Sequence, residues 1–190
     1  IITLSKPEEK IEEILAFIKK EINNGNQIFW VCPLIEESKK LDYSAAIKTY
    51  ESLSKKFHNN VGIIHGNLDK NKKKNVLNNF LNKSINILVS TTVIEVGVDF
   101  PNANVIVIEN ANKFGLSQLH QLRGRVGRGN NQGTCILLYK QNLSETAKKR
   151  IRILKSSNDG FFIAEEDMKL RGFGDVLGYQ QSGIKDFKLA

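Results

Sequence analysis

Apolar positions along the chain alternate between helical spacing and short continuous runs. Isoleucine and leucine recur at the i, i+3, i+4 spacing of a helix between Ile11 and Ile22, and Asn24-Gly25 supplies a stop signal. The β-forming run Gln27–Cys32 that follows is typical of a buried strand. The same alternation predicts further strands at Val61–Ile64, Ile85–Ser90, Val105–Ile108 and Thr134–Tyr139, and helices at Ala45–Phe57, Lys70–Leu81 and Gly115–Leu122.

Strands that are apolar on both faces and separated by helices indicate a parallel sheet covered on both sides. We therefore expect an α/β fold with at least five strands. After Tyr139, residues 144–155 and 164–170 have helical patterns, and the turn around Asn158-Asp159-Gly160 would join them as a helical hairpin. Four glycines among the polar residues 171–190 indicate an extended, hooked segment. The expected division is a sheet domain over residues 1–142 and a hairpin with its coupling segment over residues 143–190.

Composition narrows the class of protein. The chain has 190 residues, of which 41% are hydrophobic, enough for one buried core. The longest apolar runs fall far short of the ~20 residues of a membrane-spanning helix, and no charged-then-apolar leader opens the chain. We therefore expect a soluble, cytoplasmic protein without membrane contact, and a monomer, because no heptad pattern is present. Cys32 and Cys135 lack metal-ligand spacing, so buried free thiols and no metal site are expected.

Positive charge is concentrated in the C-terminal part. The net charge is +8, of which residues 1–110 contribute +1 and residues 111–190 contribute +7. All six arginines lie after residue 111, whereas the other 22 basic residues are lysines. The guanidinium fork matches phosphate oxygens better than an ammonium group does. The arginines are therefore the first candidates for phosphate contacts.

The segment Gln118–Gly129, QLHQLRGRVGRG, combines three arginines with three glycines and no acidic residue. Arg125 and Arg128 are three residues apart, close to one helical turn, so both side chains can point the same way. Paired arginines that meet developing phosphate charge are what phosphoryl transfer requires. We expect Arg125 and Arg128 to be arginine fingers; a salt-bridged helix end is the structural alternative.

The segment Ser90–Ala103, STTVIEVGVDFPNA, directly follows a predicted strand. Ligands of open parallel sheets bind beyond the carboxyl ends of the strands. The three hydroxyl residues at its start suit a nucleic-acid phosphate, and Gly97 and Asp99 suit a nucleotide. An ordinary strand-to-helix turn could contain the same residues, so this interpretation depends on the arginine segment.

Four segments occur in an order that resembles the second RecA-like lobe of superfamily 2 helicases. They are VCPLIEES (31–38), IIHGNLD (63–69), STTVIEVGVDFPNA (90–103) and FGLSQLHQLRGRVGRG (114–129). The stretch DGFFIAEEDMKLRGFGDVLGYQQSG (159–183) resembles the extension shared by RecG-type helicases and Mfd-type translocases, and VCPLIEES with LDYSAA (41–46) resembles the RecG type. The resemblance covers nearly the whole chain. It implies a RecA-like parallel sheet with helices on both faces, followed by a helical hairpin and hook.

The resemblance also implies roles for individual residues. Those implied to contact the nucleotide are Arg125, Arg128, Gln121, Glu95, Gly97 and Asp99. Those implied to bind DNA are Ser90, Thr91, Thr92, His65 and Gly66. Those implied to couple ATP turnover to movement on duplex DNA are Arg150, Arg171 and Gln181. The role of Arg123 stays open, and Arg152 has no implied role.

Two positions depart from the family pattern. Phe173 stands where proline is usual, which relaxes a turn that proline would fix, and Tyr179-Gln180 stands where Thr-Arg is usual. The missing positive charge at Gln180 is expected to weaken a DNA contact. Neither change touches Arg171 or Gln181, so coupling should survive.

The sequence lacks half of an ATP site. None of its 14 glycines is followed by lysine, so no G-x-x-x-x-G-K-[ST] phosphate loop is present, and no Asp-Glu box for magnesium occurs. We expect the chain alone to hold no cofactor tightly and to be inactive as an ATPase. The resemblance implies that ATP with Mg is held mainly by a first RecA-like lobe, and that a wedge domain grips branched DNA.

The sequence thus predicts the C-terminal motor lobe of an ATP-dependent DNA helicase of the RecG type. Its expected partners are branched or duplex DNA, the first lobe and the wedge domain, and its expected role is the remodelling of stalled forks and Holliday junctions in recombination and repair. Two alternatives stay open: an Mfd-type transcription-repair coupling translocase lobe, and a non-catalytic nucleic-acid-binding module. A change at Arg125 would distinguish a phosphate clamp, which loses DNA affinity, from an arginine finger, which loses ATP turnover.

Overall fold

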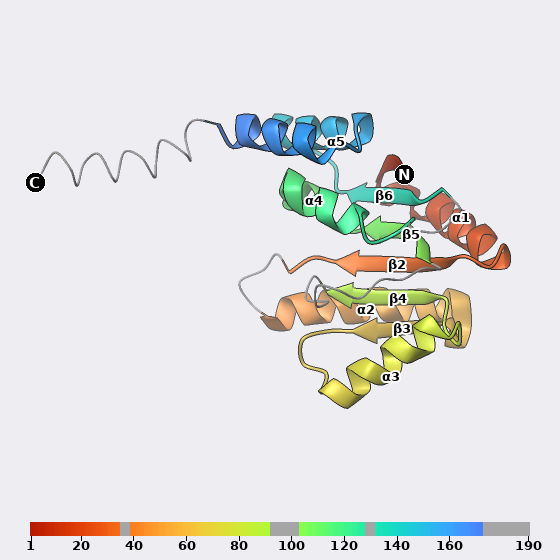
Figure 1. The fold of residues 1–190 in the computed structure, drawn as a ribbon. Coiled ribbons are helices and arrows are strands. Elements are labelled where there is room, and N and C mark those ends of the chain that lie inside the picture. Colours follow the sequence, from red (N-terminus) through yellow and green to blue (C-terminus); the bar gives the residue numbers. More distant parts are fainter. Residues whose placement is uncertain (35–38, 92–102, 128–131, 173–190) are drawn as a thin grey trace, which may run out of the picture.

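The computed structural model describes residues 1–34, 39–91, 103–127 and 132–172. Six parallel strands form one sheet in the order β1-β6-β5-β2-β4-β3 (Figure 1). The strands are β1 (Ile2–Pro7), β2 (Gln27–Cys32), β3 (Val61–Ile64), β4 (Ile87–Thr91), β5 (Ala103–Ile108) and β6 (Thr134–Tyr139). The helices are α1 (Ile11–Asn23), α2 (Lys39–Phe57), α3 (Lys70–Leu81), α4 (Leu116–Arg123) and α5 (Glu145–Ser156), followed by a helix over residues 160–172.

Two hydrophobic cores lie on the two faces of the sheet. Successive side chains of β2 alternate between them: Trp30 belongs to the core that α1 and α2 cover, and Phe29 to the core on the opposite face. The second core contains residues of α3, α4, α5 and the helix over residues 160–172. β2, β4 and β5 are buried on both faces, and most of their residues are apolar. The predicted α/β fold with a doubly covered parallel sheet is confirmed.

The edge strand β1 was not predicted. Its apolar side chains Ile2 and Leu4 are exposed at 45% and 38%, whereas Thr3 between them is buried. The usual pattern of a half-buried strand is therefore inverted, and hydropathy gives no strand signal. Backbone pairing with β6, which aligns Ile2 with Thr134, keeps the segment in the sheet.

The predicted hairpin is present, with a longer second helix. Ser144 caps α5 by accepting a hydrogen bond from the backbone N–H of Ala147 at 3.1 Å. The second helix spans residues 160–172 and not 164–170, because Asp159 caps it by accepting from the N–H of Phe161 at 3.0 Å. The expected division of the chain at residue 142 stays a prediction.

Two smaller expectations concern the cysteines and the membrane. Cys32 and Cys135 are both buried and free, as predicted. Across the described ranges, no helix combines the length and the apolarity needed to cross a bilayer.

Candidate functional site

The predicted site residues that the structure describes lie at two opposite edges of the sheet. Ser90 and Thr91 end β4, and His65 directly follows the neighbouring strand β3, so all three lie at the carboxyl edge. Arg125 lies near the amino edge, because Gly127 donates its backbone N–H to the oxygen of Ala103, the first residue of β5, at 3.2 Å. The rule that ligands meet the carboxyl ends of strands therefore locates Ser90 and Thr91 but not Arg125.

At the carboxyl edge, Ser90 and Thr91 are buried. The Ser90 hydroxyl donates to the carbonyl oxygen of Thr91 at 2.6 Å, and the two residues are 0% and 4% exposed. A phosphate contact through the Ser90 side chain would first require this hydrogen bond to break. Contact of both residues with DNA stays a prediction.

The imidazole ring of His65 is oriented by two neighbours. Its Nδ1 accepts the backbone N–H of Asn67 at 3.1 Å, and Tyr43 packs against the ring edge to face with centroids 4.5 Å apart. Burial lowers the pKa of His65, and the charge of Lys73 lowers it further. Because Nδ1 is the acceptor, the proton lies on Nε2. His65 can therefore offer one N–H donor at this edge, beside Gly66.

Helix α4 runs from the carboxyl edge of the sheet toward the amino edge. Gly115 is its N-cap residue and donates its N–H to the Gln118 side chain at 3.0 Å. The helix ends at Arg123, and Gly127 has a φ of +74°, outside the helical region. Arg125 therefore lies beyond the end of α4, which Gly124 caps. The expectation that Arg125 and Arg128 point the same way stays a prediction, because Arg128 lies outside the described residues.

The arginines at the end of α4 have different environments. Arg123 is 1% exposed and donates hydrogen bonds to the carbonyl oxygen of Leu154 at 2.5 Å, to the Thr3 hydroxyl at 3.2 Å and to Nδ1 of His120 at 2.8 Å. Burial lowers the pKa of Arg123 and that of His120. Arg123 is thus a structural tie between α4, β1 and α5, which answers the question that the sequence left open.

Arg125 is half-buried, and its guanidinium makes no hydrogen bond or ion pair with any other described residue. Val126 directly after it is 1% exposed and belongs to the core. The backbone at Arg125 is thereby fixed while its charged group stays available. Gln121, one turn earlier on α4, is exposed. These two residues can meet a phosphate group from outside the chain.

Two glycines come together behind Arg125. A Cβ atom on Gly133 would lie 2.8 Å from the Cα of Gly127, and one on Gly127 would lie 2.9 Å from the Cα of Gly133. Such distances are not tolerated without a backbone shift, so the ends of the loop between Gly127 and Gly133 can approach only as glycines. This close approach fixes the backbone of Gly127, two residues after Arg125, beside Gly133, the residue before β6.

The hairpin contacts the start of α4 through Arg150. Its guanidinium donates to the carbonyl oxygens of Phe114, at 2.5 Å, and Asn112, at 3.4 Å. The Nε atom of Arg150 and the Oδ1 atom of Asn112 are buried without a hydrogen-bond partner among the residues that the structure describes. Arg150 therefore keeps donor capacity beside the entry to α4.

Arg171, the second predicted coupling residue, lies at the same end of α4. Its Nε atom is 3.2 Å from the Oδ2 atom of Asp167, one helical turn earlier, and the Ser117 hydroxyl donates to the same oxygen at 2.8 Å. Asp167 is buried although it is charged. Asp167 was not predicted from the sequence, where the only signal was its spacing of four residues from Arg171.

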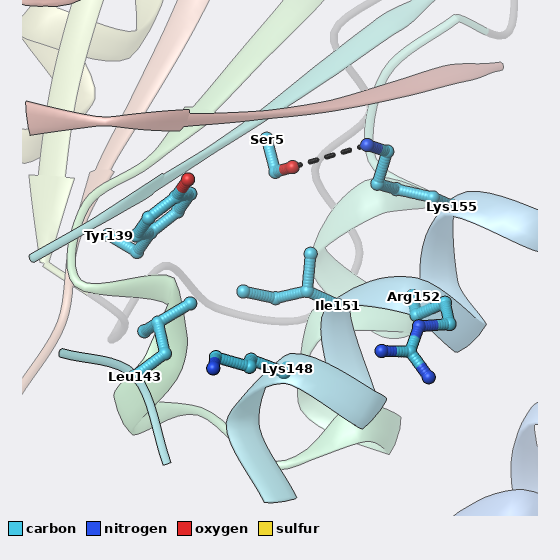
Figure 2. A pocket seen from close by; sticks show the side chains of 7 residues that line it. All are labelled: Ser5, Tyr139, Leu143, Lys148, Ile151, Arg152 and Lys155. Carbon is cyan, nitrogen blue, oxygen red and sulfur yellow. Dashed lines mark hydrogen bonds between the residues drawn. The ribbon is translucent and has the colours of Figure 1, made fainter. Parts of the chain in front are cut away.

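Arg152, which had no expected role, lines a basic pocket of about 290 Å³ between α5 and the edge of the sheet, where Ser5 of β1 and Tyr139 of β6 also line it (Figure 2). Lys148, Arg152 and Lys155 from α5 supply three positive charges, and no acidic side chain lines the pocket. Lys148 pairs with Glu145 at 3.2 Å, and the Lys155 ammonium donates to the Ser5 hydroxyl at 3.3 Å. A surface of this kind suits a phosphodiester backbone.

A half-buried carboxyl group, also missed from the sequence, joins the central strands at the carboxyl edge. Glu109 follows β5, and its Oε1 atom accepts hydrogen bonds from Nε1 of Trp30 and from the Thr49 hydroxyl, each at 2.9 Å. Burial raises the pKa of Glu109, although these two donors and the Cys32 thiol lower it. Burial also raises the pKa of Cys32 well above its usual value. Glu109 therefore ties β5, β2 and α2 together.

Six predicted site residues fall outside the described residues. They are Arg128, Glu95, Gly97, Asp99, Thr92 and Gln181, and the family departures at Phe173 and Gln180 also fall there. Among the described residues, no group of three or more His, Cys, Asp or Glu side chains could hold a metal ion. The described part therefore offers arginine and glutamine to a nucleotide phosphate but no carboxylate cluster to magnesium.

The parallel strand order, the helices on both faces and the arginine after α4 define the class as a RecA-like helicase lobe. The model of the helicase conserved C-terminal domain matches residues 9–130, so the chain belongs to this family. The model of domain 3, C-terminal, of the ATP-dependent DNA helicase RecG matches residues 157–190.

Relatives with similar sequences are RecG helicases. The chain is 52% identical over 184 residues to the ATP-dependent DNA helicase RecG of Bacillus subtilis, which covers 96% of the chain and 27% of the relative. It is 46% identical over 192 residues to that of Escherichia coli K12, covering 100% of the chain and 28% of the relative. The chain therefore spans about a quarter of the length of these curated relatives.

Two solved structures are similar to this chain in fold. RecG bound to a three-way DNA junction matches with a TM-score of 0.77 and 44% identity, covering 92% of this chain and 23% of that chain. The C-terminal domain of the DEAD-box protein Dbp5 matches with a TM-score of 0.56 and 21% identity, covering 80% of this chain and 82% of that domain. The second match supports the fold alone.

Proposed function

We propose that this chain is the second motor lobe of an ATP-dependent DNA helicase of the RecG type, which remodels branched DNA. The observation that carries the proposal is the 44% identity to a RecG chain bound to a three-way junction, over 92% of this chain. That match includes both the sheet and the hairpin. In this proposal the lobe, residues 1–142, closes an ATP site, and residues 143–190 couple it to DNA.

On the nucleotide side, Arg125 acts as an arginine finger. When bound, ATP with Mg supplies the phosphoryl group and the metal charge, and both are held mainly by a first RecA-like lobe. Arg125 contacts the γ-phosphate and stabilises the negative charge that develops there. Its lack of a partner among the described residues supports this role. Gln121 assists, as do four residues beyond the described ranges: Arg128, Glu95, Gly97 and Asp99.

On the DNA side, the carboxyl edge contacts the sugar-phosphate backbone. His65 offers its Nε2–H, and Gly66 gives an open approach because no described residue lies within 4 Å of its Cβ position. Ser90 and Thr91 end the adjacent strand β4, and Thr92, the next residue in the sequence, completes the proposed contact. The basic pocket of Lys148, Arg152 and Lys155 adds a second contact with phosphates. These three residues are part of the positive charge of the C-terminal part.

Coupling runs through the hairpin. Arg150 and Arg171 both lie at the start of α4, at the carboxyl edge, while Arg125 follows the other end of the same helix. The unpartnered Nε of Arg150 supports its role, because it leaves a donor for a coupling contact. Gln181 completes the predicted coupling set. The protein acts in the cytoplasm as a monomer, with the first lobe and a wedge domain in the same polypeptide.

The test is unwinding of a labelled three-way DNA junction by the full-length helicase in which this chain follows the first lobe and wedge domain. Strand separation that requires hydrolysable ATP, together with no hydrolysis by the 190-residue chain alone, is the expected result. ATP hydrolysis that duplex DNA stimulates without any junction unwinding would contradict the RecG-type assignment and favour a pure translocase. Hydrolysis by the isolated chain would contradict the shared ATP site.

A further inference from the structure

A single buried carboxylate oxygen joins the hairpin to the amino-terminal turn of α4. The Oδ2 atom of Asp167 accepts the Ser117 hydroxyl at 2.8 Å and lies 3.2 Å from Nε of Arg171. The Asp167 side chain is 10% exposed, whereas that of Arg171 is 58% exposed. The carboxylate therefore belongs to the interface of the two helices, and the arginine extends from it toward solvent.

The position of this carboxylate agrees with the electrostatics of α4. Ser117 is the second residue of the helix, where unpaired backbone N–H groups give a partial positive charge. A negative charge is favourable there, and α4 has no acidic residue in its first turn. Asp167 supplies that charge from another helix. The contact thus depends on the two helices keeping their present register.

The contact with Asp167 also orients the Arg171 side chain. One of its terminal nitrogens lies 3.9 Å from the position of a Cβ atom on Gly115, the N-cap residue of α4. A larger residue at position 115 would meet this guanidinium. The guanidinium is thus held over the entry to α4 by Asp167 on one side, and the missing side chain of Gly115 leaves space for it on the other.

The helix over residues 160–172 lies antiparallel to α4. Near its start, the Cβ position of Gly160 is 3.4 Å from Nε2 of His120, in the last turn of α4. Near its end, Asp167 contacts Ser117 in the first turn. The two helices therefore run alongside each other, from the edge near Arg125 to the edge where Arg171 lies.

We propose that Asp167 is a positioning residue that locks Arg171 and the first turn of α4 together, so that displacement of the helix over residues 160–172 moves the helix that precedes Arg125. This inference rests on the proposed helicase function. Asp167 touches neither ATP nor DNA in this role. Its loss should uncouple ATP hydrolysis from DNA unwinding and leave each partner site intact.

The test uses the full-length helicase with Asp167→Asn and measures junction molecules unwound per ATP hydrolysed. We expect this ratio to fall at least about fivefold, the size of a modest coupling free energy, with DNA-stimulated hydrolysis within about twofold of the parent. The matched control is Glu165→Gln, which removes an exposed carboxylate from the same helix and should leave the ratio unchanged. Hydrolysis and unwinding that fall in parallel, or an unchanged ratio, would overturn the proposal.

A second pair of variants guards against misfolding of Asp167→Asn. Ser117→Ala removes one of the two contacts and should lower the ratio by less, whereas Ser117→Thr keeps the hydroxyl and should restore it. In the double variant Ser117→Ala with Asp167→Asn, the ratio should equal that of Asp167→Asn alone. Additive losses would overturn the proposal. A parent protein that fails to unwind the junction would instead refute the proposed function, so the two failures are distinguishable.

Discussion

The Arg123 guanidinium donates a hydrogen bond to the carbonyl oxygen of Leu154 at 2.5 Å, in a region where Leu154 is 0% exposed. This buried bond connects α4, the helix before the candidate arginine finger, with α5, the first helix of the hairpin. The hydroxyl of Thr3 on β1 accepts from the same guanidinium. One arginine of the QLRGRVGR run therefore holds three elements together, while the next is available for a ligand.

Replacing Arg123 with methionine should destabilise the chain without directly removing a phosphate contact. The variant keeps apolar volume but leaves the Leu154 carbonyl buried without its donor. Losing a buried hydrogen bond from a charged group costs about 3 kcal/mol. Urea unfolding of the 190-residue chain would measure it. Arg152→Met, at an exposed arginine, is the control and should change the unfolding free energy by less than about 0.5 kcal/mol. Equal stability of the two variants would contradict the structural role of Arg123.

Gly133→Ala should strain the backbone where Gly133 and Gly127 approach each other. The added Cβ atom would lie 2.8 Å from the Cα of Gly127, so the backbone must move apart, at a cost of about 1–3 kcal/mol. Thermal unfolding against the parent checks this expectation. Gly66→Ala adds a Cβ atom that no described residue would contact within 4 Å, and it serves as the control for unfolding only. A melting temperature that Gly133→Ala leaves unchanged would mean that the close approach of the two glycines is not required.

Removing positive charge from the basic pocket should change how DNA binding depends on salt concentration. Arg152→Gln together with Lys155→Gln removes two of its three positive charges. If both contact phosphates, the slope of log K against log salt for DNA binding should become shallower by about 2, since each contact contributes about 0.9. Fluorescence anisotropy with the full-length helicase at several salt concentrations gives the slope.

Lys149→Gln is the matched control for the pocket, because Lys149 is exposed on the same helix but does not line the pocket. Its slope should stay close to that of the parent. If Lys149→Gln shifts the slope as much per charge as the pocket variant does, the effect is one of net charge and the pocket has no special contact with DNA.

Glu109→Gln should change how stability depends on pH. Burial raises the pKa of Glu109 in the folded chain, so the folded state favours the protonated carboxyl. That contribution is fully present below the unfolded pKa of about 4.3 and is lost as the pH rises through the folded pKa. Glutamine stays neutral, so in urea titrations the variant should gain stability relative to the parent as the pH rises above about 4.3. A difference that does not change with pH would contradict a raised pKa; Glu51→Gln, an exposed carboxyl on α2, controls for the lost charge.

The sequence predicted five of the six strands because their apolar runs are buried on both faces. It did not predict β1, where Ile2 and Leu4 face outward and Thr3 inward. Backbone pairing with β6 forms that strand, and hydropathy does not report backbone pairing. The second hairpin helix was predicted too short because its first residues include Phe161 and Phe162, which are exposed and do not follow the apolar spacing.

Within the candidate site, the sequence could identify residue types but not their environments. It grouped Arg123, Arg125 and Arg128 by composition, although Arg123 is buried with three partners. Which arginine faces inward depends on where α4 ends, and Gly124 and Gly127 set that end in three dimensions. Asp167 was missed for the same reason, because its partner Ser117 is 50 residues away in the chain.

The most direct test of the account is DNA-stimulated ATP hydrolysis by the full-length helicase with Arg125→Lys, with junction binding measured in parallel. An arginine finger contributes about 10³-fold or more to turnover, so the account predicts a loss of that size with junction affinity nearly unchanged. Normal turnover with weakened junction binding would contradict it. Arg125 would then be part of a DNA clamp, and the ATP site would have to be sought elsewhere.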